Sequence, residues 1–204
     1  MTELVFYTNP MSRGRIVRWM LEETGIEYAT EVIEYGPAMK QEPFISINPM
    51  GKVPAIMHGA SVVTECAAIC AYLADVYPAA GLAPAPGNRA DYYRWLFFAA
   101  GPVEYATTNF SLGFNTTTEQ SRMAGYGTYD QMLDVLEYAL TDRKFIAGDR
   151  FSAADVYIGS HVGWGLQYGT LPKRDAFTEY FAGLSLRPAW QRATDLDDAL
   201  INNR

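Results

Sequence analysis

The segment from Tyr7 to Arg18 gathers side chains that can bind an anion. It carries hydroxyls at Tyr7 and Ser12, the amide of Asn9, and arginines at positions 13, 15 and 18. Ser12 stands where a serine commonly caps a helix, yet the helix start that follows carries cations where acidic residues are preferred. This distribution of charge predicts an anionic ligand beside the segment.

The same segment contains no cysteine, which argues against a reactive thiol there. The two cysteines of the chain, Cys66 and Cys70, are four residues apart. That spacing makes them neighbours on one helix, and it provides neither a disulfide framework nor a metal site with enough ligands. We expect two small buried residues and no metal. Without a partner visible in the sequence, His58 is expected in an exposed turn and His161 in a packed helix.

Charge and composition exclude several classes of partner. The chain has 204 residues, 49% of them hydrophobic, and 16 Lys+Arg against 23 Asp+Glu give a net charge of −7. This acidity argues against a nucleic-acid partner and an anionic membrane surface. The acidic start and the absence of an apolar stretch near the ~20 residues that span a bilayer predict a cytoplasmic protein.

Alternating strand and helix patterns in the first 78 residues predict the elements that position these side chains. Residues 4–8 form a β-rich run, and Ile16, Val17, Met20 and Leu21 follow at helical spacing in a segment ended by Gly25. Residues 28–35 read as a second strand, parallel to the first. Residues 36–49 are weakly helical, 53–57 and 61–64 form a hairpin, and a helix ends at Pro78. The order is βαβ followed by ββα.

After residue 78 the sequence shows no further strand pattern. Residues 79–88 have the Gly- and Pro-rich composition of a linker, and residues 89–105, 119–140, 152–168 and 175–200 read as helices. Ser152 and Asp155 form a capping box at one helix start. We therefore predict an α/β domain over 1–78, a linker over 79–88 and an all-α domain over 89–204.

Three motifs in this order are similar to those of the cytosolic glutathione S-transferases. They are Asn-Pro-Met-Gly-Lys-Val-Pro-Ala-Ile at 48–56, Thr-Glu-Cys-Ala-Ala-Ile at 64–69, and the segment 143–155 in the helical region. The resemblance covers nearly the whole chain. It implies a thioredoxin-like N-terminal domain that binds glutathione as co-substrate, a helical domain that carries the electrophile pocket, and a homodimer.

The resemblance also implies the glutathione-binding residues. A cis peptide at Val53-Pro54 would present backbone groups of Val53 to the tripeptide, the alternative being a trans proline that merely starts an edge strand. Glu65 would take the ammonium of the γ-glutamyl group, with helix capping as its alternative role. Cys66 replaces the family's usual serine, so its backbone N–H is expected to bind the carboxylate. The expected glutathione-binding residues are Lys40, Lys52, Val53, Pro54, Glu65 and Cys66.

Ser12 resembles the catalytic hydroxyl of the serine-type transferases. Its hydroxyl would donate to the glutathione thiolate and lower the thiol pKa from ~8.5, with Tyr7 and Asn9 as alternatives. Glu104 falls where related bacterial enzymes place a helical-domain histidine, and an ionised carboxylate cannot donate a hydrogen bond. Candidates for the apolar electrophile pocket are Met11, Tyr105, Phe110, Phe114, Trp164 and Tyr168.

The resemblance predicts a glutathione transferase that activates the thiolate for attack on a hydrophobic electrophile. Two alternatives remain open: a non-catalytic binding or regulatory protein of the same fold, and a glutathione-dependent peroxidase, isomerase or dehalogenase. Because the pocket is built from several helices, the sequence does not identify the electrophile.

Overall fold

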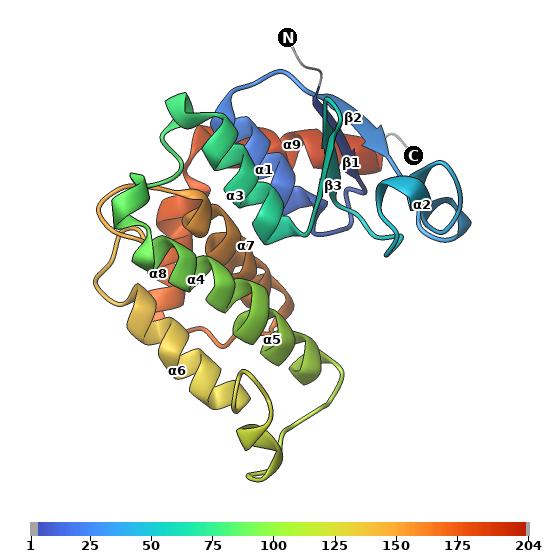
Figure 1. Cartoon of the computed structure of the whole chain (residues 1–204). Coiled ribbons are helices and arrows are strands. Elements are labelled where there is room, and N and C mark those ends of the chain that lie inside the picture. Colours follow the sequence, from blue (N-terminus) through green and yellow to red (C-terminus); the bar gives the residue numbers. More distant parts are fainter. Residues whose placement is uncertain (1–3, 203–204) are drawn as a thin grey trace. The chain divides into compact units, whose positions relative to one another are not determined.

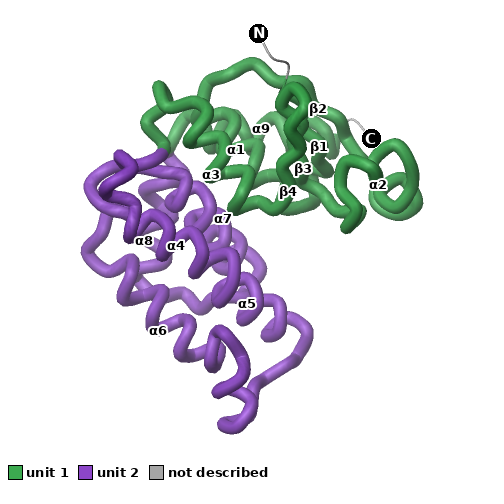
Figure 2. The backbone as a smooth tube through the Cα atoms, in the orientation of Figure 1, with its two compact units in different colours: residues 1–82, 187–204 green, residues 83–186 purple. Residues whose placement is uncertain are grey.

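The structure is a computed structural model that describes residues 4–202 (Figure 1). The chain divides into two compact units (Figure 2). Unit 1 combines the residues up to Leu82 with those from Arg187 onward, and unit 2 spans Ala83–Leu186. The C-terminal helix therefore packs with the N-terminal part of the chain, from which the sequence separates it. The functional division into 1–78, 79–88 and 89–204 stays a prediction.

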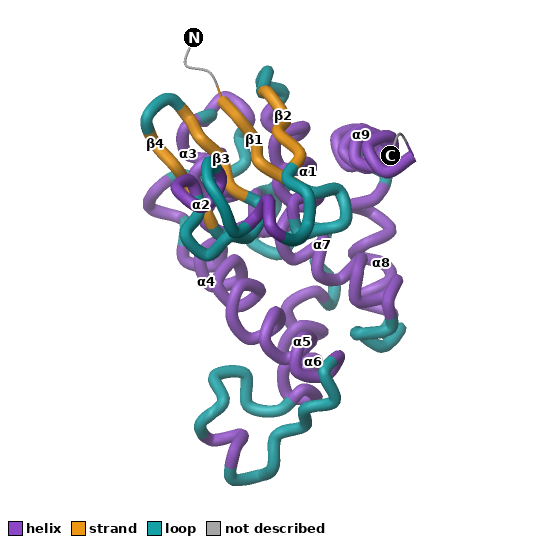
Figure 3. The backbone as a smooth tube through the Cα atoms, turned by 90° about the vertical axis from the view of Figure 1, so that its right-hand side faces the viewer, coloured by secondary structure: helices purple, strands orange, loops and turns teal. Residues whose placement is uncertain are grey.

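A mixed four-stranded sheet forms the centre of unit 1 (Figure 3). Its strands are β1 (Leu4–Thr8), β2 (Ala29–Val32), β3 (Ala55–His58) and β4 (Ser61–Thr64), in the order β2-β1-β3-β4. The β1–β2 pair is parallel, whereas β1–β3 and β3–β4 are antiparallel. This topology confirms the predicted βαβ-ββα arrangement and the thioredoxin-like fold.

Four α-helices lie among the described residues of unit 1: α1 (Gly14–Thr24), the short α2 (Phe44–Ile47), α3 (Cys66–Val76) and α9 (Pro188–Asn202). Helix α1 ends where Gly25 adopts a left-handed conformation with φ of 68°, which glycine reaches without steric cost. Alternate residues of β1 face opposite layers. The Phe6 ring lies 5.1 Å from the Arg18 guanidinium of α1, whereas Tyr7 packs beside Phe44 of α2.

The described residues of unit 2 include no strand, and the regular secondary structure of this unit is helical. Its α-helices are α4 (Ala90–Phe98), α5 (Glu104–Ser111), α6 (Tyr129–Leu140), α7 (Ala153–Tyr168) and α8 (Asp175–Ser185), with a π-helix over Ala99–Val103. Helix α7 is buried along most of its length. Gly163 and Gly165 make this close packing possible, because a Cβ there would collide with Phe181 and Leu171 respectively.

Three helix boundaries differ from the sequence-based prediction. The helix predicted over 119–140 begins only at Tyr129, and the helix predicted to end near 105 continues to Ser111 through the π-helix. The segment predicted as one helix over 175–200 is two, α8 and α9, divided at Leu186 and Arg187. Pro188 explains that break, since proline is favoured in the first turn of a helix and disfavoured in its interior.

The predicted capping box at the start of α7 is present and extends further than the motif. Asp155 is fully buried, and its carboxylate accepts hydrogen bonds from the backbone N–H and hydroxyl of Ser152. It also accepts from the backbone N–H of Ile146 at 2.7 Å and the hydroxyl of Tyr180 at 2.8 Å. One carboxylate thus joins a loop, α7 and α8 within unit 2.

We predict that Asp155→Ala lowers the free energy of unfolding by about 3 kcal/mol or more, because several buried donors lose their acceptor at ~1–3 kcal/mol each. Asp149→Ala is the matched control, since Asp149 is exposed in the preceding loop. Urea denaturation of both variants measures the difference. Equal midpoints would contradict the role given to Asp155.

Candidate active site

Asn9 fixes the loop between β1 and α1. Its side chain is fully buried. The amide nitrogen donates to the carbonyl of Ile33 at 3.0 Å, and the amide oxygen accepts from the backbone N–H of Met11 at 3.1 Å. Both ends of the amide are therefore used to hold the loop against the chain that follows β2. These bonds favour a scaffolding role for Asn9 over its alternative role as thiolate donor.

Ser12 lies half-buried just before α1. Its hydroxyl donates to the carbonyl of Asn9 at 2.7 Å and accepts from the backbone N–H of Gly14 at 2.9 Å. The oxygen thus satisfies one of the free donors at the helix start, as a capping residue does. To donate to an external thiolate, the hydroxyl must turn away from the Asn9 carbonyl.

Tyr7, the other alternative, belongs to a different layer of unit 1. It packs against an apolar cluster formed by Met39, Phe44 and Ala55, with its ring centroid 5.9 Å from that of Phe44. Burial, together with the negative charge of Glu31, raises the pKa of the Tyr7 phenol. The phenol is therefore held neutral in this packing.

The arginines of α1 are paired with carboxylates, which corrects the interpretation of Arg15 and Arg18 as cations awaiting an anionic ligand. Arg15 lies 2.6 Å from Asp198, and the buried Arg18 lies 2.9 Å from Asp197, both acids on α9. Arg18 also donates to the hydroxyls of Tyr28 and Thr30. The charge at this helix start is thus balanced from within unit 1.

The turn before β3 is closed by its own polar groups. Asn48 donates to the Lys52 carbonyl at 2.6 Å and accepts from the N–H of Met50 at 3.1 Å. Lys40, predicted to bind glutathione, donates from Nζ to the carbonyls of Met50 and Gly51 at 2.9 and 2.8 Å. Lys52 is exposed beside this turn. The structure therefore gives Lys40 a defined role in holding the turn.

The peptide bond between Val53 and Pro54 is cis, as the resemblance implies. Val53 is half-buried and Pro54 is buried directly before β3. A second cis bond, Glu42-Pro43, was not predicted from the sequence. The alternative of a trans proline at Val53-Pro54 is therefore wrong.

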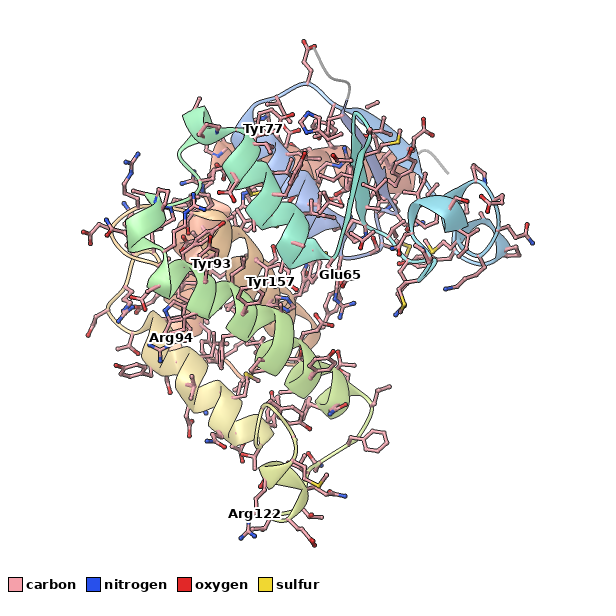
Figure 4. All side chains as sticks on the ribbon, viewed as in Figure 1. Glu65, Tyr77, Tyr93, Arg94, Arg122 and Tyr157 are labelled. Carbon is pink, nitrogen blue, oxygen red and sulfur yellow. The ribbon has the colours of Figure 1, made fainter. Side chains whose placement is uncertain are left out.

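Glu65 and Cys66 form the N-terminal end of α3, where Figure 4 shows Glu65. Glu65 has φ of 65°, a value that non-glycine residues rarely adopt, and its side chain makes no capping hydrogen bond. This geometry disfavours simple capping. The Sγ atom of Cys66 contacts the carbonyl of Arg13 at 3.6 Å, so the starts of α1 and α3 lie side by side.

Both cysteines are buried, as predicted, and neither forms a disulfide. Burial raises the pKa of the Cys70 thiol well above its ordinary value, which keeps this thiol protonated and unreactive. Within residues 4–202, no group of three or more His, Cys, Asp or Glu side chains could hold a metal. None of the helices in that range has the length and apolar character needed to cross a bilayer.

A pocket of about 350 Å³ in unit 2 includes two of the six predicted electrophile-pocket residues, Tyr105 and Phe114. Phe110 instead stacks on Tyr129 with ring centroids 4.4 Å apart. Trp164 and Tyr168, half-buried and exposed respectively, do not line this pocket, and Met11 is an exposed residue of unit 1. The remaining lining residues, which the sequence did not indicate, are Asn109, Asn115, Thr116, Gln120, Ala124 and Tyr126.

Both histidines contact other polar side chains. Glu104 begins α5 directly after the π-helix, and its Oε2 lies 3.7 Å from Nε2 of the buried His161. The His161 ring also packs edge-on against Tyr157. His58 is half-buried, with hydroxyls of Tyr72 and Tyr77 at 2.9 and 3.3 Å from its two ring nitrogens. The expectation of an exposed turn histidine is therefore wrong.

Comparisons with known proteins agree on one family. Residues 11–76 match the model "Glutathione S-transferase, N-terminal domain", and residues 93–182 match "Glutathione S-transferase, C-terminal domain". A probable glutathione S-transferase of Nicotiana tabacum is 31% identical over 155 residues, which cover 75% of this chain and 66% of that protein. The alignment thus spans about two thirds of that relative.

Two further similarities bear on the site. The disulfide-bond oxidoreductase YghU of Escherichia coli is 28% identical over 76% of this chain and 58% of its own length. A sphingomonad glutathione S-transferase, solved in complex with glutathione, is 28% identical with a TM-score of 0.77 and covers 95% of this chain and 98% of its own.

Gly14 provides a direct test of the packing at the loop. A Cβ at this position would collide with Oγ1 of the buried Thr8. We predict that Gly14→Ala lowers the free energy of unfolding by about 1–3 kcal/mol through overpacking, and that adding Thr8→Ala recovers part of the loss. Gly183→Ala is the control, because nothing lies within 4 Å of a Cβ there. Additive effects of Gly14→Ala and Thr8→Ala in thermal denaturation would contradict the collision.

Proposed function

The chain belongs to the glutathione S-transferase family, and from this membership we propose that it binds glutathione in unit 1 and activates its thiol for attack on an apolar electrophile. Glutathione transfer is the activity that gives the family its name, and relatives from Nicotiana tabacum and Hyoscyamus muticus carry the same name. The observation that carries the proposal is the 3.6 Å contact between Cys66 Sγ and the Arg13 carbonyl. It brings the proposed thiolate donor and the proposed carboxylate site to adjacent helix starts.

The charged groups of glutathione have complementary partners in unit 1. An extended peptide would pair with the backbone of Val53 at the cis turn. The γ-glutamyl carboxylate would accept from the backbone N–H of Cys66 at the positive end of α3, and the neighbouring ammonium would pair with Glu65. The exposed Lys52 would attract the other carboxylate, while Lys40 would act through the turn that it holds. The similar sphingomonad enzyme, solved in complex with glutathione, supports glutathione as the ligand.

We propose Ser12 as the donor to the thiolate. Its present acceptor, the Asn9 carbonyl, is neutral, and a hydrogen bond to a charged acceptor is roughly twice as strong as one between neutral groups. Turning the hydroxyl toward a thiolate is therefore favourable. Stabilising the charged form lowers the thiol pKa and increases the fraction of nucleophilic thiolate at neutral pH.

The electrophile is proposed to be a small apolar molecule held by aromatic side chains of unit 2. Tyr105 and Phe114 are its leading candidates because both line the 350 Å³ pocket. Phe110 is the weaker candidate because its ring is already stacked on Tyr129. Met11, Trp164 and Tyr168 stay predictions.

A second candidate, disulfide reduction, is favoured by the similarity to YghU. The loop from Tyr7 to Ser12 has no cysteine, so the glutathione thiolate itself would attack the disulfide. One thiolate of the substrate leaves, and a second glutathione resolves the mixed disulfide to oxidised glutathione and the second thiol. Release of oxidised glutathione together with both thiols of a supplied disulfide, and without a conjugate, would establish this reaction. Absence of binding heat with glutathione would favour a binding or regulatory protein.

A homodimer in the cytoplasm completes the proposal. Two large aromatic side chains one helical turn apart on α4, Tyr93 and Phe97, are 42% and 66% exposed, an apolar surface suited to a second copy. Two cysteines that form no disulfide agree with a reducing compartment. Sedimentation equilibrium of the purified chain measures the mass of the assembly.

Ser12→Ala is predicted to lower kcat/KM for conjugation of glutathione to an activated aryl halide by about tenfold to a hundredfold, because a hydrogen bond to a charged group contributes ~1.5–3 kcal/mol. The apparent thiol pKa in the pH profile should rise, because the thiolate loses a hydrogen bond. Ser12→Thr keeps the hydroxyl and serves as the control. A rate and pH profile unchanged in Ser12→Ala would exclude Ser12 as the donor.

Glu65→Gln is predicted to raise the dissociation constant of glutathione about tenfold or more, since a hydrogen bond to a charged group contributes ~1.5–3 kcal/mol. A glutathione analogue without the amino group should bind wild type and Glu65→Gln equally. Glu27→Gln, at an exposed position, controls for the loss of one negative charge. Titration calorimetry measures all three proteins, and an equal loss for both ligands would contradict the pairing with the ammonium.

A further inference from the structure

Helix α9 lies along α1 in unit 1 and contributes to a row of ion pairs with it (Figure 1). Arg187 and Arg192, at and near its start, pair with Glu23 and Glu22 of α1. Toward the end of α9 the acids are on α9 and the arginines on α1: Asp197 pairs with Arg18, and Asp198 pairs with Arg15. The helix is thus fixed to α1 at both ends by residues more than 160 positions away in sequence.

Arg15 differs from the other three arginines because it reaches the candidate active-site loop. Its Nη2 donates to Asp198 at 2.6 Å, and its Nε donates to the carbonyl of Pro10 at 2.6 Å. Pro10 lies between Asn9, which anchors the loop, and Ser12. Because the guanidinium is planar and rigid, fixing one edge of it on Asp198 also fixes the direction of the Nε–H bond.

We propose that Asp198 is a positioning residue for the transferase reaction, acting through Arg15 on the loop that carries Ser12. This inference rests on the proposed function of that loop. Asp198 itself touches neither Ser12 nor the place proposed for the thiol. It holds the guanidinium, the guanidinium holds the Pro10 carbonyl, and the loop presents Ser12 two residues later.

The exposure of this pair separates a positioning role from a structural one. The Asp198 side chain is 53% exposed and that of Arg15 is 24% exposed, and exposed ion pairs contribute little to stability. The buried Arg18–Asp197 pair, 4% and 1% exposed, remains to hold α9 on α1 when Asp198 is changed. A small misplacement of a reacting group nevertheless lowers the rate strongly. Asp198 should therefore affect turnover more than folding.

The test compares Asp198→Asn with Asp195→Asn. Asp195 lies one turn earlier on α9, is exposed, and its side chain makes no ion pair or hydrogen bond with any residue in 4–202. We expect Asp198→Asn to lower kcat for aryl-halide conjugation about threefold to tenfold, with KM for glutathione nearly unchanged and the apparent thiol pKa raised. Asp195→Asn should match wild type, Asp198→Glu should recover part of the rate, and all variants should melt at similar temperatures.

Hydrogen exchange gives a readout that does not depend on activity. The amides of Met11, Ser12 and Gly14 are bonded within the loop, and their exchange should be faster in Asp198→Asn than in Asp195→Asn. If both variants share the kinetics and exchange of wild type, the positioning role is overturned. If exchange is faster in Asp198→Asn while wild type neither conjugates nor binds glutathione, positioning stands and the proposed function fails. Equal loss of kcat in both aspartate variants would also overturn the role.

Discussion

The position of the loop between β1 and α1 is the constraint on which the candidate site depends. Three contacts from distant parts of unit 1 hold it: Asn9 to the chain after β2, Arg15 to α9, and the Arg13 carbonyl to Cys66 of α3. Gly14 lets the start of α1 pass close to Thr8. These noncovalent contacts fix the geometry of a short loop that has no covalent cross-link. A catalytic hydroxyl requires such a fixed geometry if it is to meet a thiol at hydrogen-bonding distance.

The ion pairs between α1 and α9 explain why arginines are present in the first turns of α1. The arginines at positions 15 and 18 contrast with an acidic chain of net charge −7, and from the sequence alone that contrast predicts an anion site. In the structure they neutralise Asp197 and Asp198. Burial raises the pKa of the Asp197 carboxyl, an effect that the adjacent Arg18 opposes. A helix dipole that repels cations accommodates these two because acids of another helix face them.

Local sequence signals predicted most of the fold, but they did not predict ion pairs between residues far apart in the sequence. Gly25 and the capping box at Ser152 and Asp155 end or begin helices through interactions within a few residues, so the sequence displays them. Arg15 and Asp198 are 183 residues apart, and no periodicity links them. The motif around Val53-Pro54 predicted the cis peptide that the structure contains. The Ser12 hydroxyl donates to the Asn9 carbonyl. This hydrogen bond depends on the conformation of the loop, which the spacing of residues in the sequence does not specify.

Cys66 shows how the family's arrangement tolerates an altered side chain. A thiol is a weak donor, and this one lies 3.6 Å from the Arg13 carbonyl with only 8% of the residue exposed. Its sulfur is thus used in packing the start of α3 against that of α1. At the carboxylate site proposed here, recognition would depend on the backbone N–H and the helix dipole, which are independent of residue type. A cysteine at this position is therefore compatible with the proposed site, because the backbone that would form it is retained.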